Sequence, residues 1–95
     1  MKSYKFAKCF IRYEPEIEDG MMFLFNKENG KMLEGNYLSY IVAKALMEGQ
    51  DRDVLVSTIA KTSEQDINVV QQNVKQLIDF FIQEGFIVND EFPEL

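Results

Sequence analysis

Few side chains in this chain are of the types that carry out catalysis or bind metal ions. Cys9 is the only cysteine and histidine is absent, so neither a metal site of His and Cys ligands nor a Cys–His nucleophile pair can form within the chain. Cys9 stands among Phe6, Phe10 and Ile11, which favours a partly buried strand residue over a reactive thiol. No phosphate-binding glycine loop is present either. The sequence therefore predicts a protein that is not an enzyme and needs no cofactor.

Carboxylates gather in one short segment, EPEIEDG at residues 14–20, and a carboxylate cluster can in principle bind a hard cation. Pro15 and Gly20 indicate that this segment is a turn. Acidic residues in a turn are most simply explained as solvated surface charge. We therefore expect no metal site here.

The rest of the chain is arranged around the segment from Ser63 to Gly85. The segment reads as one long helix that Ser63 caps and that Gly85 ends in a left-handed conformation. At 100° per residue, one apolar stripe faces the core; it comprises Ile67, Val70, Val74, Leu77, Ile78 and Phe81. A second line outside this stripe comprises Val69, Asn73, Gln76 and Phe80. That second line either lines a groove or is covered by a neighbouring hairpin, and spacing alone leaves both open.

The segments before the long helix change from strand to helix character near residue 36. Strands are predicted at Lys5–Tyr13, Met21–Phe25 and Lys31–Glu34, joined by the turn at 14–20 and by a turn at Asn29-Gly30. Two helices follow. The first begins at Asn36, ends at Gly49 and turns Leu38, Ile41, Val42 and Ala45 inward; the second begins at Asp51 and turns Leu55, Val56 and Ile59 inward. Residues 86–88 either add a short strand or pack on the core, and the acidic tail at 89–95 is expected to be loose.

The third predicted strand lies at an edge of its sheet. Unpaired N–H and C=O groups at Lys31, Met32, Leu33 and Glu34 would accept an extended peptide as a further strand. Alternation places Leu33 toward the core and Met32 toward solvent. Short length and flanking charge are also how proteins protect edges from aggregation, so the edge alone does not establish binding.

The whole-chain totals exclude several classes of function. The chain has 95 residues, 46% of them hydrophobic, and a formal net charge of −6. We expect a single domain over 1–95 with a core at about 5–88. Net acidity without a basic cluster argues against nucleic-acid binding, and no apolar run is long enough for a signal peptide or a membrane span. The expected location is cytoplasmic, away from membranes.

The order of elements predicts an α+β, winged helix-turn-helix-like fold with a three-stranded antiparallel sheet followed by three helices.

The segment FIRYEPEIEDGMMFLFNKENGKMLEGN, followed by helices that end in LIDFFIQEGFI, resembles the PqqD-like RiPP recognition elements. The closest matches are Arg12 in the first strand, Leu33-Glu34 before the first helix, and the EGFI helix end, over about residues 8–88. The chain departs from the family at Gly49-Gln50-Asp51, where the family commonly has a Gly-Thr-like start to the second helix.

The resemblance implies that the domain binds the leader region of a ribosomally synthesised precursor peptide and presents it to a modifying enzyme, such as a radical-SAM enzyme. It also implies that the leader docks against the third strand, in a cleft walled by the third helix. Transferred to this chain, the peptide site would comprise Lys31, Met32, Leu33, Glu34, Val69, Asn73, Gln76 and Phe80. The alternative class is a winged-helix nucleic-acid-binding regulator, and a purely structural or oligomerisation module is a third.

Overall fold

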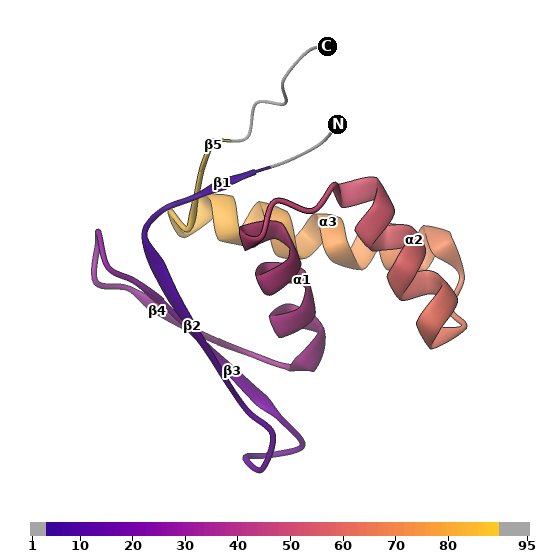
Figure 1. Cartoon of the computed structure of the whole chain (residues 1–95), viewed down its shortest axis with the longest axis horizontal. Coiled ribbons are helices and arrows are strands. Elements are labelled where there is room, and N and C mark those ends of the chain that lie inside the picture. The colour runs from indigo at the N-terminus through magenta and orange to yellow at the C-terminus, as the bar shows by residue number, and fades with distance from the viewer. Residues whose placement is uncertain (1–3, 90–95) are drawn as a thin grey trace.

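The computed structural model describes residues 4–89, and Figure 1 shows the arrangement of its elements. Residues 1–3 and 90–95, which include most of the predicted acidic tail, lie outside the described residues. In chain order the elements are β1 (Lys5–Phe6), β2 (Cys9–Glu14), β3 (Met21–Asn26), β4 (Met32–Gly35), α1 (Tyr37–Met47), α2 (Arg52–Ser63), α3 (Ile67–Gln83) and β5 (Ile87–Asn89). The predicted α+β order, a three-stranded antiparallel sheet followed by three helices, is confirmed.

The prediction of one continuous strand over Lys5–Tyr13 is wrong, because that segment belongs to two sheets. β1 pairs with β5, and β2 pairs with β3 in the sheet of order β2-β3-β4. Between β1 and β2, the N–H of Ala7 donates to the carbonyl of Phe86 at 2.9 Å, and Ala7 is buried. The chain therefore crosses from one sheet to the other at this residue, a change of partner that strand propensity does not reveal.

Strand alternation divides the three-stranded sheet into an inner and an outer face. The inner row Ile11–Leu24–Leu33 lies on the helix side and packs in or against the core. The flanking rows, Phe10–Phe25–Met32 and Arg12–Phe23–Glu34, point to the other side. All three helices lie on the inner side of this sheet in Figure 1.

The helix starts depend on side-chain caps, and one predicted cap is wrong. Asn36 accepts from the N–H of Ser39, and Asp51 accepts from the N–H groups of Asp53 and Val54, as predicted for α1 and α2. Ser63 does not cap α3. It is the last residue of α2 and donates its hydroxyl to the carbonyl of Ile59 at 2.6 Å, whereas Asp66 caps α3.

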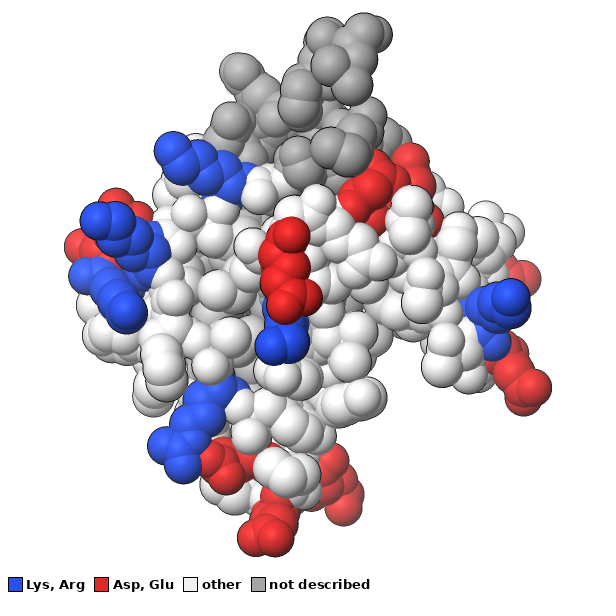
Figure 2. Space-filling model, in the orientation of Figure 1, with Lys and Arg blue, Asp and Glu red and all other residues white. Residues whose placement is uncertain are grey.

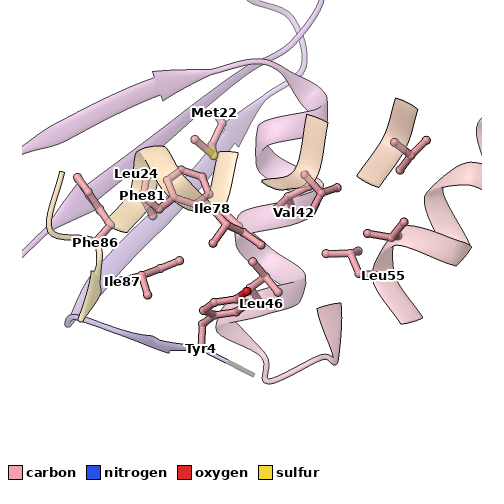
Figure 3. Packing of buried hydrophobic residues seen from close by; sticks show 14 of the residues in the cluster. Tyr4, Met22, Leu24, Val42, Leu46, Leu55, Ile78, Phe81, Phe86 and Ile87 are labelled. Atoms are coloured by element: carbon pink, nitrogen blue, oxygen red, sulfur yellow. The ribbon is translucent and has the colours of Figure 1, made fainter. Parts of the chain in front are cut away.

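The hydrophobic core lies between the sheet and the helices, and Figure 3 shows its side chains pointing toward one another. From α3 it includes Val70, Val74, Ile78 and Phe81, as predicted. Ile67, also predicted to face the core, is 49% exposed because it is the first residue of the helix and lies beyond the side chains that pack on the later turns. In α1 the buried residues are Ser39, Val42, Ala43 and Leu46, so the predicted Leu38, Ile41 and Ala45 flank the buried stripe.

None of the described helices is both long and apolar enough to cross a lipid bilayer.

Candidate functional site

The free edge of β4 presents backbone groups at two residues. The N–H of Asn26 donates to the carbonyl of Lys31 at 2.8 Å, and antiparallel pairing then alternates along the strand. Leu33 therefore bonds to Leu24 in β3, whereas the N–H and C=O groups of Met32 and Glu34 point away from the sheet. Of the four edge residues predicted from the sequence, these two offer bonds to an added strand.

The side chains of the edge residues face different directions. Met32 is 57% exposed and lies on the outer face of the sheet, while Leu33 packs against the core, as alternation predicts. Glu34 is exposed on the outer face. Lys31 lies just before the strand, where its Nζ is 3.4 Å from Oε1 of Glu84 near the end of α3. That exposed pair contributes little to stability, but it shows that the start of β4 is close to the end of α3.

A hollow of about 370 Å³ lies between α3 and the first turn of α1. Three of the four predicted helix residues, Asn73, Gln76 and Phe80, line it together with Leu77. The fourth, Val69, is 51% exposed but does not line this hollow. Phe80 is 44% exposed and lines the hollow, so the residues at 4–89 leave much of its ring uncovered, which favours the groove over the covered reading.

The opposite wall of the hollow consists of Asn36, Leu38 and Ser39, which the sequence reasoning did not include. The chain passes directly from β4 through Asn36 into α1. A cleft that β4 and α3 form together is therefore expected to include this turn. The continuity of the chain from β4 into α1 is the feature of the sequence that could have indicated these three residues. Oδ1 of Asn36 accepts from both the N–H and the hydroxyl of Ser39, so this wall is held rigid by its own cap.

Polar groups suited to a peptide backbone are present in the hollow. Within residues 4–89 the side-chain amides of Asn73 and Gln76, which line the hollow, make no hydrogen bond to another residue. Each amide offers both a donor and an acceptor. Together with the rings and aliphatic side chains of Phe80, Leu38 and Leu77, they form the mixture of apolar surface and a few polar groups that ligand sites usually have.

Asn26 fixes the position of the β3–β4 hairpin against α3. It is 1% exposed. Its Oδ1 accepts from the N–H of Glu28 at 2.8 Å and of Asn29 at 3.3 Å, and its Nδ2 donates to the carbonyl of Gly85 at 3.1 Å. Gly85 has φ of 83°, a left-handed conformation that favours glycine. These bonds join the turn before β4 to the end of α3, so they set the geometry of the cleft.

Cys9 is the candidate nucleophile that the sequence raised, and its environment does not activate it. Burial, and secondarily the charge of Glu28, raise the pKa of Cys9 above its ordinary value, which disfavours the reactive thiolate. Within residues 4–89 no group of three or more His, Cys, Asp or Glu side chains could hold a metal ion. Arg12 pairs with Glu14 on the outer face of the sheet.

No family model, curated protein or solved structure matches this chain. The candidate site therefore rests on the geometry of β4, α3 and the first turn of α1.

Proposed function

We propose that this domain binds the leader region of a ribosomally synthesised precursor peptide and presents it to a modifying enzyme, such as a radical-SAM enzyme. The observation that carries the proposal is the free edge of β4, which continues through Asn36 into the hollow that Asn73, Gln76 and Phe80 line, although no residue of β4 itself lines that hollow. The PqqD-like resemblance of the sequence agrees with this arrangement. The domain itself acts as a binding module without a cofactor.

Backbone pairing supplies register and affinity that do not depend on the peptide's sequence. A peptide strand beside β4 would bond to the outward groups of Met32 and Glu34, and its side chains would alternate between the two faces of the extended sheet. Those on the inner face would enter the hollow and contact Phe80. Those on the outer face would lie next to Met32.

Selectivity for apolar side chains is expected to come from α3. Phe80 lines the hollow and Val69 lies about three turns earlier, or roughly 16 Å along the helix axis. About five residues of extended peptide cover that distance at roughly 3.3 Å each. A peptide that places one apolar residue at Phe80 can therefore place a second at Val69, outside the hollow.

The winged-helix nucleic-acid-binding function has less support, because the candidate recognition helix lacks free positive charge. Lys75 is the only basic residue of α3, and its Nζ is 2.9 Å from Oδ2 of Asp79. Affinity for phosphate comes mainly from clustered Lys and Arg.

A titration compares the two functions directly. We expect fluorescently labelled leader segments of precursor peptides encoded near the gene to bind saturably, and random duplex DNA not to bind at moderate salt. Fluorescence anisotropy at two salt concentrations measures both. Tight duplex binding that weakens steeply with salt, without peptide binding, would contradict the proposal.

Met32→Pro tests the backbone pairing. Proline removes the outward N–H at this edge position but leaves the bonds between β4 and β3 in place. We expect the affinity for the leader peptide to fall by about tenfold or more, equivalent to roughly 1.4 kcal/mol per decade. Met32→Leu is the control, since it keeps the N–H and an apolar side chain, and circular dichroism verifies folding. A folded proline variant with unchanged affinity would place the peptide elsewhere.

A further inference from the structure

The outer face of the three-stranded sheet carries an apolar surface that the proposed peptide site meets only at Met32. Its hollow of about 590 Å³ is lined by Phe10, Arg12, Glu14, Ile17, Phe23, Phe25 and Met32. Phe10 is 55% exposed and Phe25 40% exposed. None of the described helices covers this face, since all of them lie on the other side of the sheet (Figure 1). A contiguous apolar patch on a small protein commonly marks an interaction site.

Charge is distributed unequally along the strands of this face. Lys8 and Lys27 lie at the end formed by the β3–β4 turn, accompanied by Glu28, whereas the side chain of Lys31 at this end pairs with Glu84 on the helix side. The acidic residues Glu14, Glu16, Glu18 and Asp19 lie at the opposite end, in and beside the β2–β3 turn, accompanied by Arg12. Figure 2 shows basic side chains gathered at the tip of the β3–β4 hairpin and acidic ones at the β2–β3 turn. One end of the face is therefore basic and the other acidic.

We propose that a second copy of this chain packs on the outer face, with its strands antiparallel to those of the first. A two-fold axis across the strands, above the row Ile11–Leu24–Leu33, superimposes each strand on its counterpart in reversed direction. This operation places Phe25 of each copy opposite Phe23 of the other. It also places the lysine end of each copy opposite the acidic end of the other, with Lys8 facing Glu14.

The alternative two-fold axis, parallel to the strands, would place like charges together at both ends of the interface. Juxtaposed like charges oppose association. Aligned sheet packing requires only that the mean strand directions stay within about 30°, so the reversed arrangement is compatible with ordinary twisted sheets. Charge complementarity therefore selects a second copy in the antiparallel orientation as the occupant of this face.

The size of the face sets the expected strength of the dimer. Two strands of six residues and one of four cover at most roughly 20 Å by 14 Å, and the charged turns extend this area at both ends. The resulting interface is smaller than the roughly 800 Å² per partner of a stable complex. The dimer is therefore expected to be weak and reversible. It does not rest on the proposed peptide binding, because it leaves the backbone edge of β4 and the α3 hollow free.

Sedimentation equilibrium of the full chain across the micromolar range tests the dimer. We expect a reversible monomer–dimer equilibrium that strengthens as salt is lowered. Phe25→Ser, which removes an exposed ring at the centre of the face, is expected to weaken dimerisation by about tenfold or more while circular dichroism shows an intact fold. A chain that stays monomeric at high micromolar concentration, or a folded Phe25→Ser variant that dimerises unchanged, would overturn the proposal.

Exchanging the charges at positions 8 and 14 tests whether the two copies of the dimer are antiparallel. Lys8→Glu and Glu14→Lys each place like charges together in the antiparallel dimer, so each variant alone should dimerise more weakly than the natural chain. Mixing the two variants should restore a heterodimer, because both charged contacts are again between opposite signs. The parallel arrangement predicts instead that Lys8→Glu strengthens self-association, because the variant replaces one of the like charges that meet at the lysine end. That result, or unchanged self-association of both variants, would overturn the antiparallel dimer.

Discussion

Phe81→Ala is expected to lower the free energy of unfolding by about 3 to 5 kcal/mol, whereas Phe80→Ala should change it by less than about 1 kcal/mol. The two residues are neighbours on α3 with identical side chains, so they differ only in environment. Phe81 is 1% exposed, and its ring lies 6.1 Å from that of Phe6 between ring centroids. Phe80 is 44% exposed and lines the hollow.

The same pair of substitutions should have the opposite effects on peptide binding. Phe80→Ala is expected to weaken binding of the leader peptide by one or two decades, or about 1.4 to 2.8 kcal/mol. Phe81→Ala should leave affinity nearly unchanged wherever enough of the variant is folded. Urea denaturation midpoints and peptide anisotropy, measured on both variants, give the comparison. If Phe80→Ala unfolds as readily as Phe81→Ala, Phe80 belongs to the core and the binding role is wrong.

Asn26→Ala is expected to lower the free energy of unfolding by about 2 to 3 kcal/mol. The substitution removes the three hydrogen bonds to the N–H groups of Glu28 and Asn29 and to the carbonyl of Gly85. At about 1 kcal/mol for a typical bond, and more where a buried partner is left unsatisfied, the loss reaches this range. Since the bond to Gly85 joins the end of β3 to the segment after α3, and the other two hold the turn that leads into β4, peptide affinity should fall as well.

Asn29→Ala is the matched control for Asn26. Asn29 lies in the same turn and is exposed, and its Oδ1 accepts a single bond from the N–H of Lys31. Loss of this hydrogen bond should lower the free energy of unfolding by less than about 1 kcal/mol, because water can replace the side chain as the acceptor. Urea unfolding of both variants measures the difference. Equal destabilisation would show that Asn26 contributes no more than an ordinary turn residue.

Local patterns in the sequence predict the helices and strands of this fold better than they predict which of these elements pair or pack with one another. Alternation correctly places Leu33 in the core and Met32 in solvent, and helical periodicity correctly separates Phe80 from Phe81. Periodicity does not show that the first predicted strand divides between two sheets, because pairing of β1 with β5 depends on a segment at the other end of the chain. It also does not place Leu38 opposite Phe80, since the crossing of α1 and α3 is decided by packing of the whole core.

The pairing of β1 with β5 has a consequence for the order of folding. Lys5 lies opposite Asn89, so this contact closes almost the entire chain into one loop. Loop-closure entropy grows with the number of residues enclosed, whereas the β2–β3 and β3–β4 hairpins close short loops at little entropic cost. We therefore expect the hairpins to form early and the β1–β5 contact to form late. Because the β1–β5 contact joins residues far apart in the sequence, it raises the contact order of this small domain.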